Sequence, residues 1–173
     1  IAAVERLITQ GLECHLSIAG EGPDYQAMQE LIDAYGLGDN VTLLGHQEDM
    51  TTFYRCIDVL AMPSIAEPFG LAPLEAAAEG TVPLVANVDG MADTIAARYP
   101  ELALTPKQDI AAYKALGGST AGLPDRVYDP ACDALIEPRV VDPEDLAERL
   151  FTLATQPQQM VALGHTVQDR VRS

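Results

Sequence analysis

The sequence predicts an α/β fold, a Rossmann-like parallel sheet with helices on both faces. Short apolar segments alternate with amphipathic segments of helical length over most of the 173 residues, and turns containing Gly or Pro separate them. Strands that alternate with helices in this way usually form parallel sheets whose faces are covered by the helices. Because crossover connections between parallel strands are right-handed, a doubly wound layout is the expected topology.

The elements of the first half follow from the spacing of apolar residues. Apolar side chains every three or four residues predict helices over 1–10 and 25–35. Asp24 is the expected N-cap of the second helix, since its carboxylate can accept hydrogen bonds from the free amides of the first turn. Continuous apolar runs bounded by turn residues predict buried strands. The expected strands are Cys14–Ala19, Val41–Leu44, Val59–Met62 and Val82–Ala86, and shorter helices are expected near Met50–Cys56, Pro73–Glu79 and Ala92–Ala97.

The second half loses this regularity and then regains it. Residues 98–133 contain four prolines and a Gly-Gly-Ser-Thr-Ala-Gly stretch, so we expect an irregular insertion with one short helix around Asp109–Leu116. A connection of this length in a compact domain usually serves a function or moves. A strand is expected at Ala134–Ile136, and Asp142-Pro143-Glu144 is typical of the start of a helix. A last helix over Pro157–Val171 completes a single domain of residues 1–173.

Composition and charge exclude several classes of function. The chain is 48% hydrophobic, and its 26 acidic residues against ten basic ones give a net charge of −16. This charge opposes binding to nucleic acids and to anionic lipid, which requires clustered Lys and Arg. We expect no membrane-spanning segment, since no apolar run reaches about 18 residues. We expect no secretory leader in the given chain, since no basic segment followed by an apolar one opens it. Cys14, Cys56 and Cys132 lack CxxC spacing and are expected to be buried thiols in a reducing compartment.

The segment Pro63–Glu79 carries the candidate chemistry. It follows the carboxyl end of a predicted strand and runs into a helix, which is where open α/β sheets bind ligands. Backbone amides near Phe69, Gly70 and Leu71 are expected to be free donors that favour an anion. Glu67 and Glu75 would repel a phosphate, so their expected partners are the vicinal hydroxyls of a ribose or hexose. The alternative is that both are ordinary acidic residues favoured near a helix N-terminus.

A more specific signal comes from several strings taken together. They are Leu16–Pro23 (LSIAGEGP), Gly36–Gly45 (GLGDNVTLLG), Asp58–Ser64 (DVLAMPS), Glu67–Leu71 (EPFGL) with Glu75-Ala76, and Gly80–Pro83 (GTVP). In this order and spacing they resemble the C-terminal, nucleotide-sugar-binding half of retaining glycosyltransferases of family 4, enzymes of the two-domain GT-B architecture. The resemblance covers about Leu12 to Ile95, and Ile136 to Arg172 more loosely. The segment Gly80–Ile95 also resembles bacterial glycogen and starch synthases. The two glutamates in the EPFGL context are the specific part, whereas GEGP alone is a weak signal.

The resemblance implies a role for each matching position. Glu75 would hold the donor ribose, and Glu67 would contact hydroxyls of the donor sugar and is the candidate catalytic residue. The amides of the loop around Gly70 would contact the sugar and the diphosphate. The turn after the second strand would contact the nucleobase, and the turn after the first strand would lie at the mouth of the cleft. His46 could instead be the general base of catalysis, although a contact with the edge of the nucleobase is the favoured interpretation. The remaining expected donor-binding residues are Phe69, Gly70, Leu71, Gly45, His46, Gly20 and Gly22.

The chain departs from the family pattern at three places. The Gly-Arg…Lys-Gly segment, whose cations neutralise the diphosphate, would precede residue 1, so we expect a domain truncated at its N-terminal side. Between Leu7 and Ala97 the sole cation is Arg55, against fourteen acidic residues, so the diphosphate would need a counter-charge from elsewhere. Asp89 stands before Gly90 where the family commonly has Gly-Gly, which narrows the allowed backbone. The insertion over 98–133 is the third departure.

The resemblance therefore implies the donor-binding half of a glycosyltransferase that moves a sugar from a nucleoside diphosphate sugar to an acceptor with retention of configuration. It implies the nucleoside diphosphate sugar as substrate, with no cofactor and no metal. It also implies a partner N-terminal acceptor-binding domain that is missing from this chain. We expect the chain alone to be inactive. We also expect a cytoplasmic protein, with any attachment to the membrane face made by the missing half. Two alternatives stay open: a non-catalytic Rossmann-like binding module, and a related GT-B enzyme such as a nucleotide-sugar epimerase.

Overall fold

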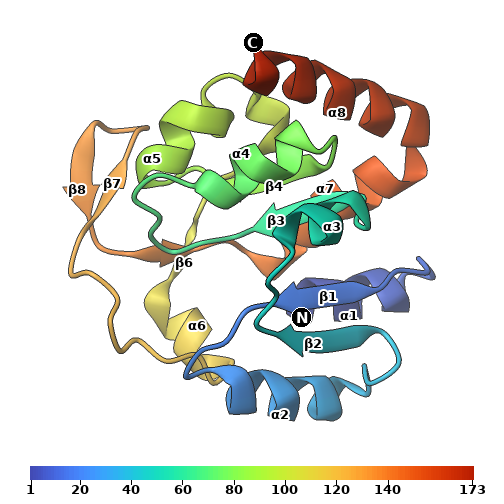
Figure 1. The fold of residues 1–173 in the computed structure, drawn as a ribbon. Helices are drawn as coiled ribbons and strands as arrows, with labels where there is room; N and C mark the ends of the chain where they lie inside the picture. The colour runs from blue at the N-terminus through green and yellow to red at the C-terminus, as the bar shows by residue number, and fades with distance from the viewer.

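A computed structural model describes residues 1–173, the whole of the chain (Figure 1). Parallel strands and helices alternate over the first half, and shorter elements follow. The helices are α1 (Ala2–Thr9), α2 (Tyr25–Tyr35), α3 (Met50–Arg55), α4 (Leu71–Ala78), α5 (Asp89–Met91), a π-helix (Ala92–Ala96), a 3₁₀ helix (Pro100–Leu102), α6 (Ile110–Ala115), α7 (Pro143–Thr155) and α8 (Pro157–Arg172). The strands are β1 (Leu16–Ala19), β2 (Val41–Gly45), β3 (Val59–Met62), β4 (Val82–Ala86), β5 (Ala103–Leu104), β6 (Gln108–Asp109), β7 (Val127–Asp129), β8 (Ala134–Ile136) and β9 (Arg139–Val140).

The parallel strands form two sheets. β1 pairs with β2, with Leu16 opposite Val41, and β3, β4 and β5 form the other sheet in that order. All of these pairings are parallel, so the predicted α/β architecture is confirmed. β1 and β3 are not paired with each other, and the sheet is therefore divided where a doubly wound fold would be continuous. The strands of both sheets run in the same direction in Figure 1, which brings their carboxyl ends to one edge.

The main core surrounds β4. All five residues of this strand are buried, and successive side chains of a strand point to opposite faces, so β4 is covered on both sides. Ala77 of α4, Leu153 of α7 and Val167 of α8 belong to the same buried cluster. A smaller cluster around Val41 joins β2 to α1 and α2. The two sheets thus have separate cores.

The expectation for residues 98–133 needs correction. The short helix is present as α6, but the segment also contains β5, which pairs with β4 in the larger sheet, and Leu102 just before it is fully buried. β7 and β8 form an antiparallel hairpin, and β6 pairs with β9. A strand of only two residues before Thr105-Pro106 offers no alternating pattern to detect, because its burial is decided by the sheet that it joins.

The cysteine expectation is also wrong at two of three positions. Cys14 is half-buried, and its burial raises the pKa of the thiol. Cys56 ends α3 at the surface, and Cys132 lies in the exposed turn of the β7–β8 hairpin. Both of these thiols are exposed because one lies at the end of a helix and the other in a turn, where neither position faces the core. In a separate respect, no helix of the fold combines the length and the hydropathy that crossing a membrane requires.

Candidate functional site

The predicted donor-binding residues lie in two groups at the carboxyl ends of the parallel strands (Figure 1). One group occupies the loop of residues 63–70 after β3, together with the first two turns of α4. The other group lies at the ends of β1 and β2. Because β1 and β3 are not paired, the two groups sit on opposite sides of the division in the sheet.

The 63–70 loop folds its glutamate back onto its own amides. Oε1 of Glu67 accepts hydrogen bonds from the Gly70 amide at 3.1 Å and, more weakly, from the Phe69 amide at 3.4 Å. Gly70 is the N-cap of α4 with φ +76°, and a Cβ there would lie 2.6 Å from Cγ of Met91. The expectation that these two amides are free donors is therefore wrong. The Glu67 carboxylate itself takes the anion position at the start of α4.

Asp89 holds this loop from the side of β4. Its Oδ2 accepts from the Glu67 amide at 3.1 Å, and its Oδ1 accepts from the Tyr128 amide at 2.9 Å. The Gly90 amide in turn donates to the Glu67 carbonyl at 3.2 Å. Asp89 adopts φ +42°, a left-handed conformation that is uncommon outside glycine. Asp89 therefore adopts a conformation that glycine reaches at no steric cost, and its side chain makes two hydrogen bonds that a glycine could not make.

Gly90 permits the close approach of the two backbones. A Cβ at this position would lie 2.2 Å from the Pro68 carbonyl oxygen and 2.8 Å from Cα of Phe69. Because both of these atoms belong to the backbone, a side chain there would push the 63–70 loop away from α5.

Glu75 has a different hydrogen-bond partner from Glu67. It is exposed on α4, and its Oε2 accepts a hydrogen bond from the Tyr54 hydroxyl of α3 at 3.2 Å. Burial of Tyr54, together with its hydrogen bond to Glu75, raises the pKa of this phenol to about 12. Arg55 pairs with Glu79 at 2.7 Å, so it does not supply a counter-charge to the 63–70 loop.

The second group brings together the ends of β1 and β2. The Gly20 amide donates to the Gly45 carbonyl at 2.8 Å, and Gly45 turns the chain with φ +64°. His46 follows on the exposed surface, and the Gly22 carbonyl accepts from the Tyr25 amide at 3.3 Å. Gly20 and Gly45 are thus in direct contact through the backbone, and the part of these positions in donor binding stays a prediction.

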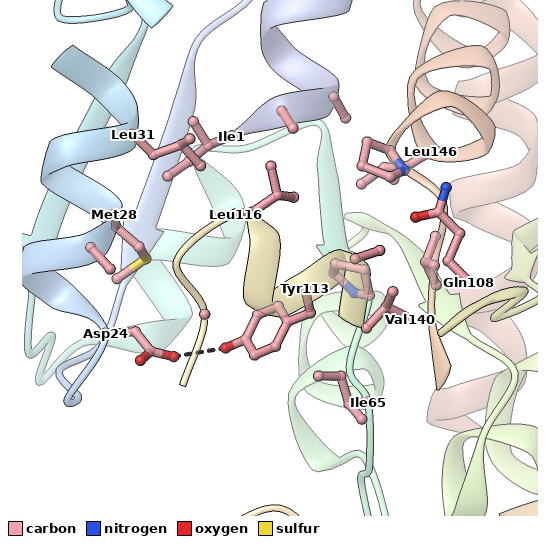
Figure 2. A pocket seen from close by; sticks show the side chains of 18 of the residues that line it. Ile1, Asp24, Met28, Leu31, Ile65, Gln108, Tyr113, Leu116, Val140 and Leu146 are labelled. Carbon is pink, nitrogen blue, oxygen red and sulfur yellow. Dashed lines mark hydrogen bonds between the residues drawn. The ribbon is translucent and has the colours of Figure 1, made fainter. Parts of the chain in front are cut away.

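An apolar cavity of about 470 Å³ lies beside the 63–70 loop (Figure 2). Ile18 of β1 lines one side and Ile65 of the 63–70 loop another, while Tyr113 of α6 and Leu116 just after it also line the cavity. None of the predicted donor-binding residues lines this cavity. Segments from both halves of the divided sheet and from the 98–133 region therefore meet here.

Asp24 has a different role from the one expected. It precedes α2, but its side chain makes no capping hydrogen bond. Instead Oδ2 accepts from the Tyr113 hydroxyl at 2.7 Å, which Figure 2 shows, and Oδ1 accepts from the Ser119 amide at 3.2 Å. Burial and this aspartate raise the pKa of Tyr113 to about 12. Asp24 therefore stands at the predicted N-cap position, but the expected side-chain capping bond is absent because distant donors occupy the carboxylate.

Sequence reasoning missed the partners of the site more than the site itself. Tyr54, Tyr113 and Tyr128 gave no signal, since a tyrosine in an apolar pattern is indistinguishable from a core residue. Asp89 did give a signal, as an aspartate where glycine is common, but the carboxylate's use was not foreseen. The structure contains no group of three or more His, Cys, Asp or Glu side chains placed to hold a metal ion.

Comparison with known proteins adds a family to this geometry. The family model of glycosyl transferases group 1 matches residues 1–116. The chain is 34% identical over 104 residues to 2-deoxystreptamine N-acetyl-D-glucosaminyltransferase of Streptomyces fradiae, covering 59% of this chain and 24% of that protein. It is 40% identical over 81 residues to D-inositol 3-phosphate glycosyltransferase of Mycobacteroides abscessus, covering 45% of this chain and 18% of that protein. The chain thus spans about a quarter or less of these curated relatives.

Solved structures share the fold at lower identity. Sucrose-phosphate synthase from Thermosynechococcus elongatus matches with a TM-score of 0.67 and 23% identity, over 99% of this chain and 37% of that one. A glycosyltransferase from Rickettsia africae matches with a TM-score of 0.70 and 16% identity, over 98% and 37%. Anabaena HepE, solved with UDP and glucose, matches with a TM-score of 0.67 and 17% identity, over 98% and 38%. These TM-scores establish the fold, and at such low identity they establish the fold alone.

Proposed function

The chain belongs to the group 1 glycosyl transferases, and on that premise we propose that it is the donor-binding half of a retaining glycosyltransferase. The fold is that of the C-terminal half of GT-B glycosyltransferases. The proposed reaction moves a sugar from a nucleoside diphosphate sugar to an acceptor with retention of configuration. The observation that carries the proposal is the Glu67 carboxylate seated on the amides at the N-terminus of α4, inside the matched family segment.

The amides of the 63–70 loop are the proposed contact for the donor diphosphate. They already hold a carboxylate oxygen, so their geometry suits an anion. In the proposed complex a phosphate oxygen replaces the carboxylate, and Glu67 turns to accept hydroxyls of the donor sugar. The amides and the dipole of α4 would then stabilise the charge that develops on the diphosphate leaving group.

Glu75 is the proposed contact for the ribose. Only its Oε2 is hydrogen-bonded to Tyr54, which leaves Oε1 for a ribose hydroxyl. The Tyr54 hydroxyl would hold the carboxylate in one orientation while it accepts from the ligand. Gly20, Gly22, Gly45 and His46 complete the proposal on the side of β1 and β2, where the base would lie.

The rest of the enzyme is proposed to come from outside these 173 residues. Two observations support this: the relatives are about four times longer than the matched part, and β1 and β3 present unpaired facing edges. One further parallel strand would join the two sheets. We also propose that the missing part supplies the acceptor site and the cations for the diphosphate, so the chain alone does not turn over.

The test exchanges Glu67 and Glu75 for glutamine in the complete protein. Both E67Q and E75Q should lower the rate of sugar transfer by orders of magnitude, because a neutral amide accepts hydroxyls less strongly than a carboxylate. E79Q is the matched control, since Glu79 lies at the C-terminal end of α4, pairs with Arg55 and lies outside the proposed site. Transfer at the wild-type rate by E67Q and E75Q would contradict the proposal.

A non-catalytic binding module is the second candidate. The observation that favours it is again the Glu67 carboxylate, which satisfies the amides that a donor would need. A module of this kind keeps its partner in the E67Q and E75Q proteins and shows no transfer in the wild type. Pull-down of the partner alongside the transfer assay distinguishes the two candidates.

A further inference from the structure

Asp89 has an unfavourable backbone conformation, whose cost its side-chain hydrogen bonds must offset. Its φ of +42° lies in the left-handed region, which glycine adopts freely and other residues reach only at a cost. Aspartate is among the residues that tolerate this region, because its short polar side chain can bond locally. Here both bonds of the carboxylate go to distant segments, one 22 and the other 39 residues away.

The two oxygens of this carboxylate serve different segments. Oδ2 accepts from the Glu67 amide in the 63–70 loop, and Oδ1 accepts from the Tyr128 amide of β7. An asparagine has a single acceptor oxygen, and its amide nitrogen can only donate. Only a carboxylate therefore fits two N–H groups that approach its two oxygens.

The Glu67 peptide is held on both of its sides. Its amide donates to Asp89, and its carbonyl accepts from the Gly90 amide at 3.2 Å. The position of the Glu67 Cα is thereby fixed relative to α5, and the side chain is left to reach the Gly70 amide. A shift of Asp89 would move Glu67 with it.

The β7–β8 hairpin is the other segment fixed by Asp89. Val127 at its start is buried, whereas Leu135, which pairs with Tyr128 across the hairpin, is 66% exposed. Within the hairpin the Tyr128 hydroxyl donates to Asp133 at 2.9 Å, so the residue that Asp89 contacts is also braced across the turn. The hairpin and the 63–70 loop therefore share one carboxylate.

We propose that Asp89 is a positioning residue whose carboxylate joins the β7–β8 hairpin to the Glu67 peptide and so sets how Glu67 meets the donor sugar. The proposal rests on the proposed function for its last step, the contact of Glu67 with sugar hydroxyls. The 98–133 region would then act at the site through its last residues, which form the first strand and the turn of the β7–β8 hairpin.

The first test needs no ligand. Amide hydrogen exchange is measured over residues 66–71 and 127–136 in the 173-residue chain and in its D89G and D89N variants. D89G should exchange faster in both segments because it loses both bonds, and D89N should exchange faster in at least one because its side chain has a single acceptor oxygen. D93N is the matched control: Asp93 lies four residues further on and is exposed, and its side chain makes no hydrogen bond. Wild-type exchange in either segment of D89G overturns the coupling.

The second test separates positioning from folding. D89G relieves the backbone cost at φ +42° but loses both hydrogen bonds, so a merely structural Asp89 predicts altered stability with unchanged binding. Affinities of the complete protein are measured for UDP, ADP and GDP and for UDP-glucose, ADP-glucose and GDP-mannose. We expect D89G to reduce by about tenfold the gain in affinity that the sugar adds, with the affinity for the nucleoside diphosphate unchanged.

The outcomes keep this inference distinct from the proposed function. Nucleotide binding by the wild type together with an unchanged sugar increment in D89G overturns the positioning role and leaves the donor site standing. Binding of no nucleotide by the wild type overturns the donor site and the sugar step together. In that case the exchange measurement alone decides whether Asp89 couples the hairpin to Glu67.

Discussion

Asp24 and Asp89 stand at similar places on the two sides of the divided sheet, but their carboxylates bind different numbers of segments. Each lies in a connection that follows the carboxyl end of a parallel strand, and each accepts two hydrogen bonds. Asp24 binds one segment only, the α6 region, through Tyr113 and Ser119. Asp89 binds two segments, one of which carries Glu67.

Each aspartate makes these hydrogen bonds at a different structural cost. Asp24 keeps an ordinary backbone with φ −87° and forgoes capping α2. Asp89 accepts a left-handed backbone with φ +42°. A lost cap weakens one helix end, whereas a strained backbone is maintained only where the surroundings fix it firmly. We therefore expect the β4 side of the edge to be rigid and the α6 side to be readily displaced.

The sharpest contrast is between Gly90→Ala and Gly118→Ala. The new Cβ would lie 2.2 Å from a backbone oxygen of Pro68 in one case, and 2.2 Å from the Tyr113 ring in the other. A backbone cannot give way, so Gly90→Ala should cost about 2–3 kcal/mol of the free energy of unfolding. The ring can turn aside with the loss of its bond to Asp24, for about 1 kcal/mol. Urea unfolding measures both, and an equal or larger cost for Gly118→Ala would refute the contrast.

Two alanine variants test the missing cap. Asp49 does cap its helix, since it accepts from the Thr52 amide at 2.9 Å. Asp49→Ala should therefore speed amide exchange in the first turn of α3 and cost about 1 kcal/mol. Asp24→Ala should cost about 1–2 kcal/mol by leaving Tyr113 without its partner, and should speed exchange in α6. The first turn of α2 should not change. Faster exchange there would mean that Asp24 caps α2 in solution.

The smallest expected effect is the alkaline dependence of Tyr113. Its pKa is raised to about 12 in the folded state, against about 10 in an unfolded chain. The stabilisation from the protonated phenol is thus complete below about pH 10 and lost as the pH rises toward 12. Tyr113→Phe should make the fall in stability over this range shallower. Tyr25→Phe, at an exposed position, is the control. Parallel curves for Tyr113→Phe and the wild type would show that the bond to Asp24 does not form.

Local patterns predicted the elements and the edge that carries the site. β3 and β4 were predicted residue for residue, because each is an apolar run bounded by turn residues. Since all parallel strands end at one edge, the placement of Glu67 and Gly20 at that edge followed from the order of elements. α4 begins at Leu71, two residues before the predicted start, because Gly70 serves as its N-cap.

Long-range pairs were not predictable in the same way. The Asp24–Tyr113 bond spans 89 residues and the Asp89–Tyr128 bond spans 39. Neither has a local signature, since capping patterns describe only the nearest amides. The same holds for β5, which is a strand because β4 offers it an edge. The sequence therefore located the candidate site but not the contacts that position its residues.

Binding of a nucleoside diphosphate sugar at this edge of the sheet is the central feature of the proposed function. The direct measurement is a thermal-shift titration of the complete protein, which includes the proposed source of the cations for the diphosphate, with UDP, ADP and GDP and with one sugar nucleotide of each. At about 100 times its Kd, a bound ligand should stabilise the fold by roughly 2.7 kcal/mol. We predict such a shift for one nucleotide, lost in Glu75→Ala and retained in Glu79→Ala. No shift with any of the six ligands, or the same shift in Glu75→Ala as in the wild type, would contradict the donor site proposed here.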